Sequence, residues 1–169
     1  MARKIYIRSN EFPYHVTVRC INKEWFVNTE ETWNIMEEYL YFIHHAYNVK
    51  IFAFILMGNH FHLLVHAPEG NLSTAIGYFL RETSRQLIKS AHRINETYGA
   101  RFHRSEIISY RSFENVYKYL YYNPVRAGVV KYVEEYRYST LQGLLGFRHS
   151  IIPAQDSLLM DSDIESTLR

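Results

Sequence analysis

Hydrophobic and polar residues alternate strictly near the start of the chain. Residues 14–21 read Tyr-His-Val-Thr-Val-Arg-Cys-Ile, and this pattern of β-branched residues predicts a strand. Since successive side chains of a strand point to opposite faces, alternate residues should share one buried face. These are Tyr14, Val16, Val18 and Cys20.

A helical spacing of apolar residues follows this strand. Asn28 or Thr29 can cap the predicted helix, and two glutamates stand in its first turn. The apolar positions that recur at helical spacing are Trp33, Met36, Leu40, Ile43 and Tyr47.

Strand patterns then recur at Lys50–Leu56 and His60–His66, with a turn at Gly58-Asn59 between them. A turn-forming stretch around Pro68 precedes a long helical pattern, predicted over Ser73–His92. The last two predicted elements are a strand over Arg101–Ser109 and a helix over Ser112–Asn123. The order strand-helix-strand-strand-helix-strand predicts an α+β fold of the ferredoxin-like, split βαβ type, with helices packed on one antiparallel sheet.

Composition supports a single domain with a short tail. The chain has 169 residues, of which 47% are hydrophobic, so it can bury a substantial core. Composition changes after Phe147, and we expect a domain over residues 1–147 followed by an acidic tail over residues 148–169. Cys20 is the only cysteine, and neither a signal-like start nor an apolar run of 18 residues occurs. These features predict a cytoplasmic protein without a membrane partner.

The modest net charge of +2 hides an asymmetry along the chain. Residues 151–169 carry −3 and the preceding residues +5. Basic residues spaced by four form a stripe along the helix predicted over residues 73–92, which indicates either a phosphate-binding ridge or a solvated helix face. The members of this stripe are Arg81, Arg85, Lys89 and Arg93.

Two histidines stand two residues apart within a predicted strand. His60 and His62 therefore share a face, and two neutral imidazoles held side by side are half of a divalent-metal site. The alternative is a structural pair on the surface or joined by a hydrogen bond. His66 has the same parity, but strand rise puts it about 20 Å from His60, too far to share one ion.

Several motifs of this chain occur together in one protein family. They are Tyr14-His15-Val16-Thr17, Asn59-His60-Phe61-His62-Leu63-Leu64, Arg101-Phe102, and Tyr119 followed by Asn123-Pro124-Val125-Arg126-Ala127-Gly128. In these motifs the sequence resembles the single-tyrosine HUH transposases, in particular the REP-associated branch. The chain departs from that pattern in two places. Gly58 stands where relatives usually have proline, and no tryptophan precedes Arg101.

The resemblance implies a metal-dependent endonuclease and strand transferase that acts on single-stranded DNA beside a hairpin. Its nucleophile would be a tyrosine that forms a 5′-phosphotyrosine and releases a 3′-hydroxyl. On the last predicted helix, Tyr119 and Asn123 lie along one flank, whereas Tyr117 falls in the apolar stripe. We therefore expect Tyr119 to be the nucleophile and Asn123 to join His60 and His62 as a metal ligand. Ligand softness favours Mn²⁺ and cellular abundance favours Mg²⁺.

The basic residues supply candidate contacts to DNA phosphates. They are Arg3, Lys4, Arg8, Arg81, Arg85, Lys89, Arg101, Arg104 and Arg126. Two alternatives remain: a domesticated module that binds DNA hairpins without cutting them, and a metal-stabilised interaction domain. The resemblance allows a monomer or a homodimer. The acidic tail is either a disordered terminus or a segment that docks near the DNA-binding surface and competes with the strand.

Overall fold

The computed structural model describes residues 10–91 and 96–155. Its main elements follow the predicted order of strands and helices. They are β1 (Tyr14–Arg19), α1 (Thr29–Tyr47), β2 (Lys50–Leu56), β3 (His60–His66), α2 (Leu72–Ser90), β4 (His103–Glu106) and α3 (Tyr110–Arg126). Three short helices were not predicted, namely η1 (Ile21–Lys23), η2 (Val133–Glu135) and α4 (Leu141–Leu144).

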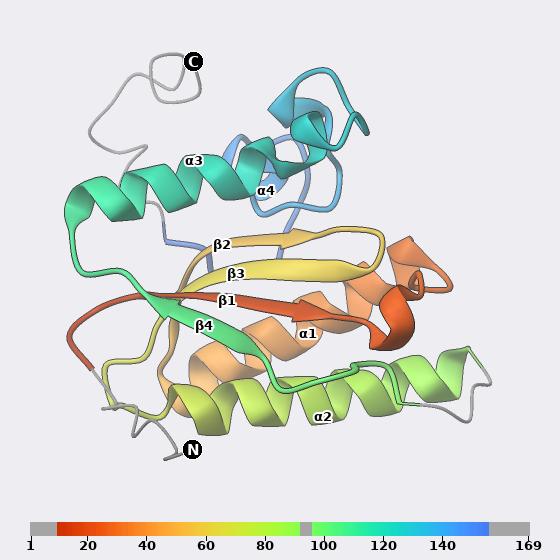
Figure 1. The fold of residues 1–169 in the computed structure, drawn as a ribbon, viewed down its shortest axis with the longest axis horizontal. Helices are drawn as coiled ribbons and strands as arrows, with labels where there is room; N and C mark the ends of the chain where they lie inside the picture. Colours follow the sequence, from red (N-terminus) through yellow and green to blue (C-terminus); the bar gives the residue numbers. More distant parts are fainter. Residues whose placement is uncertain (1–9, 92–95, 156–169) are drawn as a thin grey trace.

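The four strands form one antiparallel sheet in the order β2-β3-β1-β4. Helices α1 and α2 cover one face of the sheet, while α3 and α4 lie on the other (Figure 1). This arrangement confirms the predicted α+β fold of the split βαβ type.

Strand alternation divides the buried residues into two cores. One core joins the sheet to α1 and α2 and contains Val16, Trp33 and Phe61. The other joins the sheet to α3 and contains Leu64 and Tyr117. Because Leu64 shares strand parity with the predicted metal ligands of β3, those ligands lie on the face covered by α3.

Local capping explains where α1 and α3 begin. Asn28 Oδ1 accepts a hydrogen bond from Glu31 N at 3.1 Å, so Asn28 caps α1. Ser109 Oγ accepts one from Ser112 N at 3.2 Å, and α3 therefore begins before the predicted start at Ser112.

Helix α3 also ends later than the predicted end at Asn123. Pro124 lacks an N–H, but the helix continues through it to Arg126. Ala127 N donates to Asn123 O at 2.9 Å and completes the last turn.

The boundaries of β4 and α2 differ slightly from the predicted ones. Strand β4 is shorter than predicted: Ile107 N still donates to Pro13 O at 2.9 Å, but proline has no N–H with which to continue the ladder. Helix α2 begins one residue early and ends at Ser90, two residues before the predicted end.

The first part of the expected acidic tail packs on the domain. Ile152 is buried in the core beneath the sheet, and Gln155 N donates to Ile51 O at 2.7 Å on the edge strand β2. Arg148 forms an ion pair of 3.3 Å with Glu30. Residues 156–169, the rest of the expected tail, lie outside the described residues. The docking of the tail near the DNA-binding surface therefore stays a prediction.

No described helix is both long and apolar enough to span a bilayer.

Candidate active site

The predicted nucleophile and metal ligands line one groove between the sheet and α3. The groove has a volume of about 780 Å³. The predicted site residues that line it are His60, His62, Arg101, Tyr119 and Asn123. They come from β3, from the segment before β4 and from α3, so the fold gathers residues that are distant in sequence.

Helix α3 presents Tyr119 to the groove and turns its neighbouring tyrosines away. Tyr119 is 38% exposed, whereas Tyr117 and Tyr121 are each only 1% exposed in the core beneath the helix. The ring centroids of Tyr119 and His62 are 5.8 Å apart in an edge-on contact. Tyr119 is thus the accessible phenol beside the histidine pair.

The two histidines of β3 lie side by side as strand parity predicts. Their ring centroids are 5.1 Å apart, and the two rings are almost perpendicular. His60 Nδ1 donates to Asn59 Oδ1 at 2.8 Å, which leaves its Nε2 lone pair free to bind a metal. His66 lies at the other end of β3, where its Nε2 donates to Asn10 O at 2.8 Å, far from the groove.

Burial keeps these imidazoles neutral. It lowers the pKa of His62 to about 3, with further contributions from His15, His60 and Arg19. Burial also lowers the pKa of His60, and the positive charge of Arg19 adds to this effect. Neutral imidazoles are the form that binds divalent metals, so the electrostatics fit a ligand role.

His15 contacts the site residues, although the sequence indicated it only within the motif Tyr14-His15-Val16-Thr17 and gave it no role in the site. Its Nε2 lies 3.0 Å from His62 Nδ1, and its ring is edge-on to Tyr119 at 6.2 Å between centroids. When His62 donates from Nδ1, its Nε2 keeps a lone pair for a metal. His15 therefore orients His62. Two signals in the sequence could have indicated it: its place in the motif Tyr14-His15-Val16-Thr17, and the strand parity that it shares with Thr17 of the groove.

Asn123 fits the role of an oxygen ligand. Its side-chain amide nitrogen is buried and has no hydrogen-bond partner among the described residues. Because the two ends of an amide are interchangeable by a flip, this unpartnered group can present either atom to the groove. Two neutral imidazoles and one amide are a suitable donor set for a divalent ion. Within the described part of the chain, no cluster of three histidine, cysteine or acidic residues offers an alternative set.

Two of the predicted phosphate-binding arginines lie near the groove, and a third points to the opposite face of the sheet. Arg101 lines the groove, and the guanidinium of Arg126 lies 5.6 Å from the ring centroid of Tyr119. Arg104 points to the other face of β4, where its Nη1 donates to Ser73 Oγ at 3.0 Å. Arg101 and Arg126 are thus near the reacting groups, and Arg104 is not.

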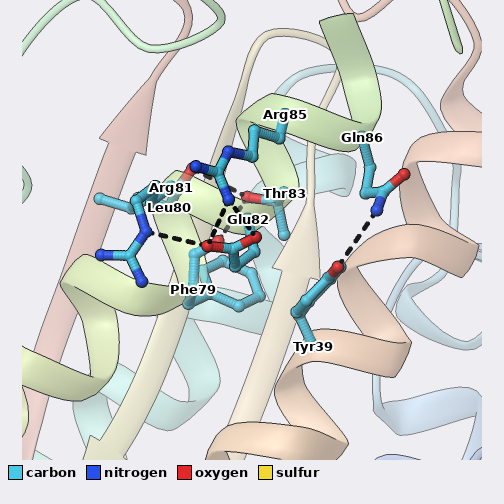
Figure 2. Close-up of polar contacts among 8 residues, drawn as sticks. All are labelled: Tyr39, Phe79, Leu80, Arg81, Glu82, Thr83, Arg85 and Gln86. Carbon is cyan, nitrogen blue, oxygen red and sulfur yellow. Dashed lines mark hydrogen bonds and ion pairs between the residues drawn. The ribbon is translucent and has the colours of Figure 1, made fainter. Parts of the chain in front are cut away.

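Helix α2, which carries the basic stripe, lies on the opposite face of the sheet from α3, whose residues line the groove (Figure 1). Figure 2 shows that Glu82 accepts from two arginines of this stripe: Arg81 Nε is 2.9 Å from its carboxylate and Arg85 Nη1 is 3.2 Å away. The stripe therefore does not lie at the groove, and the carboxylate of Glu82 partly neutralises its positive charge. Lys89 is exposed near the end of the same helix. The predicted contacts Arg3, Lys4, Arg8 and Arg93 lie outside the described residues.

Comparisons with known proteins agree with this architecture. The family model described as "Transposase IS200 like" matches residues 8–123. A protein of Haemophilus influenzae named as a REP-associated tyrosine transposase is 30% identical over 105 residues, which are 56% of this chain. The match spans 60% of the length of that relative.

A solved structure shares the fold. The structure of a REP-associated tyrosine transposase bound to a REP hairpin aligns with a TM-score of 0.71. The alignment covers 92% of this chain and 93% of that chain at 19% identity. The match of the family model over more than half of the sequence decides the assignment: the chain belongs to the IS200-like transposase family.

Proposed function

We propose that this protein cuts and rejoins single-stranded DNA beside a hairpin, through a covalent link between the DNA and Tyr119. The observation that carries the proposal is the convergence of Tyr119, His60, His62 and Asn123 in one groove. A phenol next to two neutral imidazoles suits metal-assisted phosphoryl transfer, because the phenol can act as the nucleophile and the imidazoles can bind a divalent metal.

In the proposed reaction, the Tyr119 phenol loses its proton to solvent and its oxygen bonds to the scissile phosphorus. The bond from phosphorus to the 3′ oxygen breaks, and that oxygen takes up a proton to become a 3′-hydroxyl. The product is a 5′-phosphotyrosine, which keeps the energy of the phosphodiester for rejoining. Reversal with a different 3′-hydroxyl transfers the strand.

His60, His62 and Asn123 would hold a divalent metal, Mg²⁺ or Mn²⁺, which polarises the phosphate and stabilises the charge that develops on it. His15 and Asn59 hold the two imidazoles in place through hydrogen bonds. The guanidinium of Arg126 lies over the Tyr119 ring, where its positive charge would favour the phenolate.

The proposed DNA substrate follows from the charge of the groove. Arg19, Lys23 and Arg101 line it, and none of the described lining residues is acidic. A cationic groove of this kind suits the phosphates of a single strand. A folded hairpin beside the cleavage point is proposed because a relative of the same fold binds one.

The proposal is tested by incubating the protein with Mn²⁺ and hairpin-bearing single strands that are labelled on the 3′ side of candidate cleavage sites. A labelled, protease-sensitive protein band that survives denaturation is the expected result. Tight hairpin binding without any adduct would instead identify a domesticated, non-cleaving binding module and contradict the proposed activity.

A charge comparison separates the groove from the stripe of α2. We expect Arg101→Gln combined with Arg126→Gln to weaken single-strand binding and to lower the slope of log Kd against log salt by about 1.4, roughly 0.7 for each lost phosphate contact. The matched variant, Arg81→Gln with Arg85→Gln, should change the slope less, because Glu82 pairs with both residues. Fluorescence anisotropy across salt concentrations measures the slopes. An equal decrease of the slope in the two variants would show that Arg81 and Arg85 of α2 also bind DNA phosphates.

A further inference from the structure

The connection between β1 and α1 is bound to the turn that precedes β3. Cys20 N donates to Asn59 O and Phe26 N donates to Gly58 O, both at 2.9 Å. Asn59 Nδ2 also donates to Lys23 O at 3.1 Å. Since Asn59 orients a proposed metal ligand as well, this connection is held directly against the active site.

Two residues of the connection have a left-handed backbone conformation, which is held by contacts with neighbouring segments. Asn22 and Lys23 have φ values of 53° and 59°, in the left-handed region that residues with a Cβ rarely adopt. Such conformations persist where neighbouring contacts over-determine them, and they gather at functional sites. Among the residues that this connection exposes to solvent is one large aromatic side chain, Trp25.

The indole of Trp25 lies on Gly58 and remains widely exposed. Its side chain is 72% exposed, while the next residue, Phe26, is 7% exposed. A Cβ at Gly58 would lie 2.2 Å from Trp25 Cζ3 and 2.4 Å from Cε3, so any residue other than glycine would displace the ring. The chain thus seats a large aromatic surface beside the active-site turn and leaves much of it uncovered by the rest of the described protein.

Trp25 does not itself line the cationic groove, but the residues on either side of its ring bring it close to the groove. Gly58 precedes His60 by two residues, which places their Cα atoms within about 7 Å of each other. Lys23, in the same connection, lines the groove together with Arg19 and Arg101. A cationic groove that follows a phosphate backbone, combined with an exposed aromatic ring at its margin, is the usual design for binding a single strand.

We propose that Trp25 is a stacking platform for a nucleobase of the strand whose scissile phosphate lies beside Tyr119. This inference rests on the proposed function and adds a subsite to it. Every nucleobase has a π-face, so the platform contributes affinity and positions the strand without selecting a particular base. Gly58 is the residue that makes room for it.

Intrinsic fluorescence gives a direct test, because the chain has two tryptophans and the other, Trp33, is 1% exposed in the core. Equilibrium titrations in the Tyr119→Phe background avoid cleavage. We expect a DNA hairpin with a single-stranded extension to quench the fluorescence, and the same hairpin without the extension to leave it unchanged. Trp25→Leu should remove the quenching.

Affinity provides the second readout. Trp25→Leu should raise the Kd for the extended hairpin about tenfold or more, the loss expected for one base stack, and should leave the Kd for the bare hairpin unchanged. Tyr110→Leu is the matched control, because Tyr110 is 65% exposed at the far end of α3 and should not affect either Kd.

Two results would overturn the platform. One is an extended hairpin that binds without quenching and with the same Kd for Trp25→Leu, in a protein that still forms the adduct through Tyr119. The other is quenching that depends on protein concentration and not on DNA, which would place a second copy of the chain on Trp25. Failure of the proposed function differs from both, because the wild-type chain would then form no adduct. If Trp25→Leu does not fold, the fluorescence of the protein that retains Trp25 still tests the platform, because only the extended hairpin should quench it.

Discussion

Tyr119→Phe is expected to abolish the covalent adduct and to reduce cleavage at least ~10³-fold, because it removes only the attacking oxygen. The change keeps the aromatic ring, so the edge-on contact with His62 and the contact with Arg126 should survive. Binding of hairpin DNA should therefore remain within about twofold of the wild type, since phosphate contacts supply most of the affinity. Denaturing gels measure the adduct, and anisotropy measures the binding.

Tyr122→Phe is the control for this experiment. Tyr122 lies on the same helix, is partly buried, and packs with the core beneath α3 instead of lining the groove. We expect its variant to form the adduct as the wild type does. Adduct formation by Tyr119→Phe together with its loss in Tyr122→Phe would show that the assignment of the nucleophile is wrong.

His60→Ala and His62→Ala are each expected to lower the cleavage rate by ~10² or more, because a bound metal supplies several kcal/mol of transition-state stabilisation. A chelator should cause a comparable loss in the wild type, and added Mn²⁺ or Mg²⁺ should restore it. Part of the loss in each variant should be recovered at higher metal concentration, since the other ligands remain.

His66→Ala serves as the matched control on the same strand. His66 lies at the opposite end of β3 and donates to Asn10 O, so its loss should leave the cleavage rate and the metal requirement unchanged. Full activity of His60→Ala and His62→Ala, or full activity of the wild type in chelator, would remove the metal from the proposed mechanism.

The elements and their buried faces were predictable from local patterns. A period of two identified β1, strand patterns between turn signals identified β2 and β3, and helical spacing with a cap identified α1, because such signals arise from residues a few positions apart. The same local rules placed His60 and His62 on one face, and separated Tyr119 from the buried Tyr117. The short helices η1, η2 and α4 escaped detection, since segments of three or four residues show no periodicity.

The contacts between distant segments could not be predicted in this way. His15 reaches His62 only because β1 and β3 pair in a register that sets Thr17 opposite His62. Trp25 and Gly58 are 33 positions apart, and only the hydrogen bonds between the two loops bring the ring onto the glycine.

The sequence by itself determined the order of elements, the shared face of the two histidines and the flank of α3 that carries Tyr119, because these depend on the geometry of single strands and helices. Only the tertiary structure decided which charges accompany the site. The spacing of Arg81 and Arg85 is visible in the sequence, but the face that α2 covers is set by the packing of its apolar side against α1 and the sheet. That packing turns the stripe away from the groove, and strand pairing with loop contacts assembles Arg19, Lys23 and Arg101 there instead.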